Sequence, residues 1–277
     1  MTTGTLLLTL QDGVSKWLIE DYSVGEILFY RGLWAYVPIA FFAWRSGGWH
    51  VLRSARPTVN VVRACLNSCA GLAIISAYAF MPLATAMAIM FASPILVTAL
   101  SVSLLGEPVG RWRWFAVLLG FIGVMLILQP EHGVWEWFLL LPLLAAVLIA
   151  MRDVLTRKLG AVDDPTAILF YTVTASVAFG ALWMAVYGAS WPSSQAWAVF
   201  VALGLLNGVA HFATIKAFTV ARAATLMPLR YLSLVWAGLI GFMVWGDVPT
   251  TLALAGAVLV VASGLVIVLR ERQQANA

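Results

Sequence analysis

Long apolar runs follow one another along almost the whole chain, separated by short polar or basic stretches. A helix needs about 20 mostly apolar residues to cross a bilayer, and most of these runs approach that length. The pattern therefore predicts an all-α integral membrane protein with ten transmembrane helices. We place them at 4–20, 26–44, 60–80, 84–105, 112–129, 134–151, 166–188, 196–217, 224–245 and 250–269.

Basic residues gather in alternate loops of this ten-span arrangement. They include Arg45, Arg53, Arg56 and Arg63 around the second loop, Arg111 and Arg113 in the fourth, and Arg152, Arg157 and Lys158 in the sixth. The intervening loops carry acidic residues instead, among them Glu20, Asp21, Glu131 and Asp247. Because basic loops stay in the cytoplasm, we expect both termini to be cytoplasmic.

The two halves of the chain repeat several features in nearly the same register. Ile27-Leu28-Phe29-Tyr30 recurs as Ile168-Leu169-Phe170-Tyr171, and Asp12 matches Asp153, Lys16 matches Arg157, Asn67 matches Asn207 and Gly106-Glu107 matches Gly246-Asp247. A repeat of five spans is odd in number, so its second copy must enter the membrane inverted. We predict two inverted five-helix repeats, 1–130 and 131–277, forming one membrane domain around a central cavity. Such repeats are typical of secondary transporters that work by alternating access.

Composition agrees with a lipid environment. The chain is 62% hydrophobic and 10% charged, whereas a soluble domain carries roughly 25% charged residues. The net charge of +4 is explained by the basic loops, so we expect no nucleic-acid partner. Most of the tryptophans lie near predicted span ends, where amphipathic rings favour the membrane interface, as at Trp34, Trp44 and Trp191.

Specific motifs strengthen the transporter interpretation. Asp12-x-x-x-Lys16, Glu26-x-x-Phe29-x-Arg31, Gly106-Glu107 and the Gly-rich last span resemble the EamA-type drug/metabolite transporters. The resemblance implies ten helices in two inverted halves, in a bacterial-type inner membrane. Within that superfamily the chain is similar to the amino-acid exporters of the YddG type. Other members carry S-adenosylmethionine, riboflavin, nucleotide sugars or cationic drugs. The alternatives for this chain are therefore uptake of a cofactor-like solute, S-adenosylmethionine or riboflavin, and export of a cationic drug.

Ionisable residues inside a membrane are costly, so each needs a partner or a function. Asp12 and Lys16 lie four residues apart on one helix face. They either neutralise each other or bind the two ends of a zwitterionic substrate. Glu26 and Arg31 open the second span and are either an interface anchor or gate latch, or ligands of the substrate. His211 is either a proton relay or a packing residue.

Aromatic and methionine side chains within the spans could hold the apolar part of a substrate. Gly204 and Gly208 form a small-xxx-small pattern that predicts a close helix seam inside the bundle. The predicted substrate-binding residues are Asp12, Lys16, Trp17, Tyr78, Met90, His211, Arg230 and Tyr231.

Motifs of other functional classes are missing from the sequence. We find no phosphate-binding loop, no nucleophile elbow and no His/Cys cluster with metal-ligand spacing. We therefore expect no catalytic residue, no cofactor and no metal. A monomer is compatible with the sequence, which does not determine the oligomeric state. A membrane-embedded enzyme is the weaker alternative, since the acids are scattered and His211 is isolated. The leading hypothesis is a secondary transporter that exports amino acids, with broad or aromatic preference.

Overall fold

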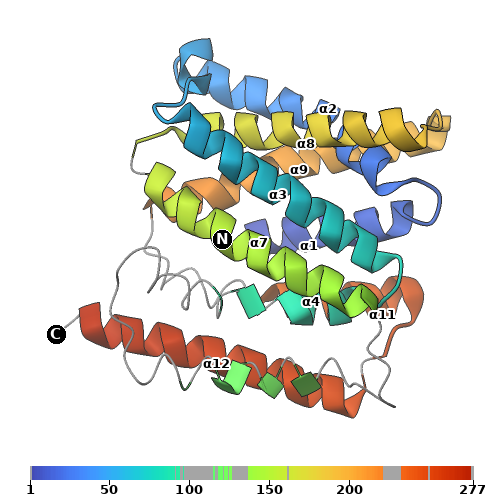
Figure 1. Cartoon of the computed structure of the whole chain (residues 1–277), viewed down its shortest axis with the longest axis vertical. Coiled ribbons are helices and arrows are strands. Elements are labelled where there is room, and N and C mark those ends of the chain that lie inside the picture. The colour runs from blue at the N-terminus through green and yellow to red at the C-terminus, as the bar shows by residue number, and fades with distance from the viewer. Residues whose placement is uncertain are drawn as a thin grey trace.

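A computed structural model describes residues 2–90, 92–93, 96, 115, 118–120, 122–123, 125–126, 137–160, 162–220, 232–248 and 250–275. Every regular element in these residues is a helix (Figure 1). The α-helices are α1 (Thr2–Leu18), α2 (Val24–Arg45), α3 (Pro57–Tyr78), α4 (Leu83–Met90), α7 (Leu140–Leu159), α8 (Pro165–Tyr187), α9 (Ser194–Val220), α11 (Leu232–Trp245) and α12 (Thr251–Ala275). Two short 3₁₀ helices, η1 (Trp49–Leu52) and η3 (Trp137–Leu139), precede α3 and α7.

Five of the described helices are long and apolar enough to cross a membrane: α2, α3, α7 together with η3, α8 and α9. These elements follow the predicted spans closely, except for the sixth. Helix α7 continues to Leu159, so Arg152 belongs to a helix and not to a loop as predicted. Arg63 likewise lies within α3. A span predicted from hydropathy ends where charged residues begin. A helix can continue past them when the charged side chains form hydrogen bonds or ion pairs. Most of the predicted spans 84–105 and 112–129 lies outside the described residues.

Helix α2 illustrates how sequence pattern becomes packing. Ser23 caps its first turn in a capping box, in which the Ser23 side chain accepts from the Glu26 N–H and Glu26 accepts from the Ser23 N–H. Farther along, Ala35 and Ile39 are buried, while Val37 is 52% exposed. The exposed apolar residues of α2 share one face and are Leu33, Val37, Phe41 and Trp44. Such a stripe suits contact with lipid tails.

Glycines let α9 approach α2 closely. A Cβ atom added at Gly204 would lie 2.4 Å from Trp34 Cβ and 2.5 Å from the carbonyl oxygen of Arg31. One added at Gly208 would lie 2.3 Å from Pro38. The predicted seam inside the bundle is therefore confirmed for this pair. Trp34 packs in the interior of α2 against this seam, and not at a span end as predicted.

Helices α2 and α8 run in opposite directions, and their ends are joined by two carboxylates. At the start of α2, Glu26 Oε1 accepts hydrogen bonds from the N–H and the hydroxyl of Ser190, which follows α8, both at 2.6 Å. At the other end, Asp163 precedes α8 and accepts from the Ala55 N–H at 2.7 Å and from the Ser54 hydroxyl, both after α2. In both contacts a carboxylate accepts from a serine hydroxyl and from a backbone N–H. The carboxylate belongs to α2 in the first contact and to Asp163, just before the N-cap of α8, in the second.

Several of the larger helix contacts fall into equivalent pairs. Helix α1 packs on α9 and α11, and α7 packs on α3 and α4. Helix α2 packs on α9, and α8 packs on α3. Each contact maps onto its mate when α1, α2, α3 and α4 are exchanged with α7, α8, α9 and α11. This is the pattern that a twofold relation between the halves produces.

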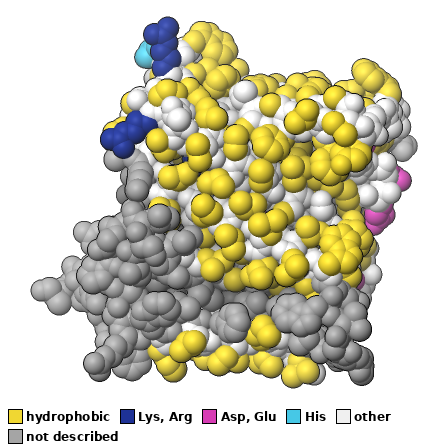
Figure 2. Space-filling model, in the orientation of Figure 1, with side chains coloured by type: hydrophobic (Ala, Val, Ile, Leu, Met, Phe, Trp, Pro, Cys, Tyr) yellow, Lys and Arg dark blue, Asp and Glu magenta, His cyan; other side chains and the backbone are white. Residues whose placement is uncertain are grey.

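The surface separates apolar and charged regions. Figure 2 shows hydrophobic side chains spread over the face in view, Lys and Arg at one end of the long helices, and acidic groups at the other. The basic end carries the α2–α3 connection, in which Arg45, Arg53 and Arg56 are exposed. Trp44 and Trp191, at opposite ends of the bundle, are 75% and 82% exposed. An apolar belt between polar ends is what a bilayer requires.

Candidate functional site

A cavity of about 190 Å³ lies between the two halves of the chain. Helices α1, α2, α3 and α4 line it from the first half, and α7, α9 and α11 from the second. Its charged lining among the described residues consists of three arginines, Arg31, Arg63 and Arg152, and two aspartates, Asp12 and Asp153. One positive charge is therefore in excess.

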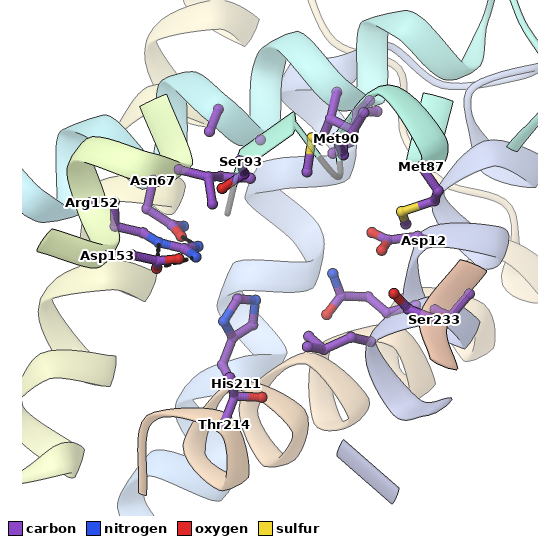
Figure 3. A pocket seen from close by; sticks show the side chains of 18 of the residues that line it. Asp12, Asn67, Met87, Met90, Ser93, Arg152, Asp153, His211, Thr214 and Ser233 are labelled. Carbon is purple, nitrogen blue, oxygen red and sulfur yellow. Dashed lines mark hydrogen bonds and ion pairs between the residues drawn. The ribbon is translucent and has the colours of Figure 1, made fainter. Parts of the chain in front are cut away.

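One side of the cavity is built by α3 and α7 (Figure 3). Nε and Nη2 of Arg152 donate to Oδ1 of Asp153 at 3.0 and 2.7 Å, and Nη1 donates to Oδ1 of Asn67 at 2.8 Å. These bonds occupy all three nitrogens of the guanidinium. These charge-assisted hydrogen bonds stabilise the positive charge of Arg152 inside the bundle.

Arg63 is anchored next to this group. Its Nε donates to Oγ1 of Thr156 at 2.8 Å, and its Nη1 donates to Oγ1 of Thr172 on α8 at 2.5 Å. The residue is 3% exposed, so its burial depends on these hydroxyls. Arg63 ties α3 to α7 and α8 while its charge remains at the cavity wall.

Asp12 lies on the opposite side, on α1, with Ser233 near it and Met87 above it in the view of Figure 3. Asp12, Arg31 and Tyr78 are close enough to interact electrostatically. The buried Tyr78 hydroxyl nevertheless forms no hydrogen bond of normal geometry with a described residue. This side therefore has polar groups whose hydrogen-bonding capacity is unused.

Apolar side chains connect the two polar sides. Ile74 and Ile75 come from α3, and Met87 and Met90 come from α4. Thioether side chains are flexible and polarizable, so they adapt to ligands of different shape. A small molecule with separated charges and an apolar body matches this arrangement. Within the described parts of the chain, no group of three His, Cys, Asp or Glu side chains is placed to hold a metal ion.

The structure brings four of the predicted residues together: Asp12, Tyr78, Met90 and His211 all line the cavity. Lys16 lies outside it and forms an ion pair with Asp247 at 3.3 Å, packing over the Trp245 ring. The expected pairing of Asp12 with Lys16 is therefore replaced by a contact between α1 and the end of α11. Trp17 is 48% exposed and does not line the cavity. Arg230 and Tyr231 lie outside the described residues.

Sequence reasoning missed the arginines of the cavity. Arg63 was placed around a loop although the predicted span 60–80 contains it, and Arg152 was placed in a loop. Arg31 was given a ligand role only as the alternative to an anchor or latch. The signal that could have found Arg152 is its neighbour, because Asp153 matches Asp12 in the repeat. Asn67 is a second signal, because it matches Asn207 in the repeat and accepts a hydrogen bond from Arg152.

Known proteins resemble this chain over nearly its whole length. A model described as the EamA-like transporter family matches residues 4–129 and again residues 136–269. An S-adenosylmethionine uptake transporter of Rickettsia prowazekii (strain Madrid E) is 28% identical over 267 residues, 96% of this chain and 90% of that protein. A riboflavin transporter of Rhizobium johnstonii is 30% identical over 277 residues, 99% of this chain and 91% of that protein.

Two further similarities extend the comparison. The pseudopaline exporter CntI of Pseudomonas aeruginosa (strain UCBPP-PA14) is 26% identical over 273 residues, which is 95% of each protein. A solved crystal structure superposes with a TM-score of 0.64 at 20% identity, covering 99% of both chains. That similarity supports the fold alone. The relatives named here are not amino-acid exporters, so they favour the alternative substrates over the amino-acid assignment.

Proposed function

Because this chain belongs to the EamA-like transporter family, we propose that it carries a cofactor-like solute of the S-adenosylmethionine type across a bacterial-type inner membrane. Family membership makes the chain a multi-pass transporter of small metabolites and not an enzyme. The substrate, the direction and the membrane are the parts that we propose.

The observation that carries the proposal is the charge pattern of the central cavity. Asp12 lies on one side, and Arg152 with Asp153 lies on the other. S-adenosylmethionine has a carboxylate, an ammonium group and a sulfonium, joined to a ribose and an aromatic adenine. Opposite charges can hold its polar end, while Met87 and Met90 accommodate the rest. Similarity to S-adenosylmethionine uptake transporters over nearly the whole chain supports the same substrate.

Amino-acid export is the second candidate. A free amino acid carries the same carboxylate and ammonium groups, so the cavity charges would serve it equally well. Riboflavin has neither group, and only the similarity to riboflavin transporters favours it. Binding of S-adenosylmethionine and of amino acids should therefore depend on the cavity charges, whereas binding of riboflavin should not.

The proposed mechanism is alternating access between two inverted five-helix repeats, 1–130 and 131–277. The opposite directions of α2 and α8 and the paired helix contacts support an inverted relation. A site between the halves can face either side in turn, because each half moves against the other. We propose ten spans with both termini in the cytoplasm.

Counterflow in proteoliposomes tests the proposal without assuming a direction. Vesicles loaded with unlabelled S-adenosylmethionine should accumulate the labelled compound, and protein-free vesicles should not. Asp12→Asn should reduce accumulation by at least about tenfold, because a substrate cation loses its charged partner. Asp21→Asn, an exposed carboxylate just beyond α1, should leave it unchanged. Accumulation of riboflavin or of phenylalanine alone would overturn the proposed substrate.

A further inference from the structure

Resting on the proposed function, we infer that Arg31 is the residue that binds the carboxylate of the transported solute. Arg31 lines the cavity from α2 and is 7% exposed. The assignment separates it from the other two cavity arginines, whose guanidinium groups are held by the protein. It also names a specificity determinant, since solutes without a carboxylate would gain nothing from it.

The first argument is that Arg31 has no partner among the residues with a described position. Arg63 donates to two threonine hydroxyls, and Arg152 donates to Asp153 and Asn67. Arg31 forms no hydrogen bond or ion pair with any of the residues that the structure describes. A guanidinium has five N–H donors, and leaving them unused in a buried position is costly. A ligand that enters the cavity can satisfy them.

The second argument is that the backbone of Arg31 is fixed in place. Its carbonyl oxygen packs against Gly204 of α9. One turn C-terminal to Arg31 on α2, Ala35 is fully buried. On the cavity side, a Cβ atom added at Gly71 of α3 would lie 3.5 Å from Nη2 of Arg31, which is ordinary van der Waals contact, so the guanidinium lies close to the α3 backbone. A binding group on a rigid helix loses little conformational entropy when the ligand arrives.

The third argument is the charge facing Arg31. Asp12 and Arg31 both line the cavity and interact electrostatically without forming an ion pair. A zwitterion placed between them brings a carboxylate to Arg31 and a cation to Asp12, and so improves the contacts of both. The substrate thus replaces a long-range attraction with two charge-assisted hydrogen-bonded contacts.

The planar fork of arginine matters for this role. A guanidinium can bind a carboxylate through two parallel hydrogen bonds, whereas a lysine ammonium acts as a point charge. Hydrogen bonds to charged groups are worth enough that losing the carboxylate should weaken binding about 10- to 100-fold. The same loss is expected whether the carboxylate is removed from the ligand or Arg31 is removed from the protein.

The test compares two probes, S-adenosylmethionine and its decarboxylated form, by calorimetry on the detergent-purified full chain. The wild type should bind the first about 10- to 100-fold more tightly. Arg31→Gln should bind both equally, and Arg31→Lys should keep only part of the preference. The control Arg45→Gln, an exposed arginine at the end of the same helix, should behave as the wild type does.

The outcomes separate this inference from the proposed function. If the wild type binds both probes with equal affinity, the assignment of Arg31 is wrong while the substrate class stands. If Arg31→Lys and Arg31→Gln both retain the full preference, another residue binds the carboxylate. If the wild type binds neither probe, the proposed function fails first, and the role of Arg31 fails with it.

Discussion

Arg152 on α7 donates a hydrogen bond from Nη1 to the side-chain oxygen of Asn67 on α3 at 2.8 Å. The matching asparagine of the second half, Asn207 on α9, donates to Gln11 on α1 at 3.0 Å. Gln11 and Arg152 each directly precede the matched aspartates, so the two bonds join equivalent positions. One position carries a charge and the other does not. The two contacts therefore occupy matching positions of the sequence repeat but differ in charge.

This difference predicts unequal costs for the two asparagines. Asn67→Ala should lower the free energy of unfolding by about 1.5–3 kcal/mol, because its partner is charged. Asn207→Ala breaks a bond between neutral groups and should cost about 0.5–1.5 kcal/mol. Thermal unfolding of both variants in the same detergent checks the order. A larger loss of stability for Asn207→Ala would show that the charge of Arg152 does not make the Asn67 contact the stronger of the two.

The ion pair between Lys16 and Asp247 should couple α1 to the end of α11. We expect Lys16→Met and Asp247→Asn each to destabilise the protein more than the double variant does, since each single change leaves one charge unpaired. Neighbouring pairs show interaction energies of about 0.5–3 kcal/mol in such cycles. The exchanged pair, Lys16→Asp with Asp247→Lys, should recover part of the loss. Additive effects of the two single changes would show that the pair contributes nothing.

Two glycines in helices make a matched pair for packing. Gly204→Ala places a Cβ atom 2.5 Å from the Arg31 carbonyl oxygen, so the α2–α9 seam must open. We expect a cost of about 1–3 kcal/mol from this overpacking. Gly238→Ala on α11 meets nothing within 4 Å and should be neutral or stabilising, since alanine favours a helix. Melting temperatures of the two variants should move in different directions or by clearly different amounts.

Topology can be checked at the two ends of the α2–α8 pair. In a Cys65→Ser, Cys69→Ser background, Ser46→Cys should react with an impermeant thiol reagent from the cytoplasmic side. Ala189→Cys should react from the opposite side, because α2 and α8 are antiparallel and the two loops lie at opposite ends. Both positions are exposed. Labelling of Ala189→Cys from the cytoplasm would reverse the proposed orientation.

Much of the fold was predictable because it depends on local pattern. Apolar length set α2, α3, α8 and α9 to within a few residues, since a bilayer fixes how much chain must be buried. Gly204 and Gly208 identified a seam, because only small side chains allow two backbones to approach. The end of α7 was missed, since Arg152 and Asp153 lower the hydropathy that defines a span.

The sequence by itself determined that this chain crosses a membrane many times and repeats its pattern in two halves. It also predicted that Asp12, Tyr78 and His211 lie within the membrane spans. Only the tertiary structure decided which charges face the cavity and which bind each other. Lys16 forms an ion pair with Asp247, and Arg152 binds Asp153 and Asn67. The Arg31 guanidinium has no partner among the described residues. The physical reason is that a buried charge is governed by the few groups within hydrogen-bonding distance. Those groups come from helices far apart in the chain, and the periodicity of the sequence does not predict which helices pack together.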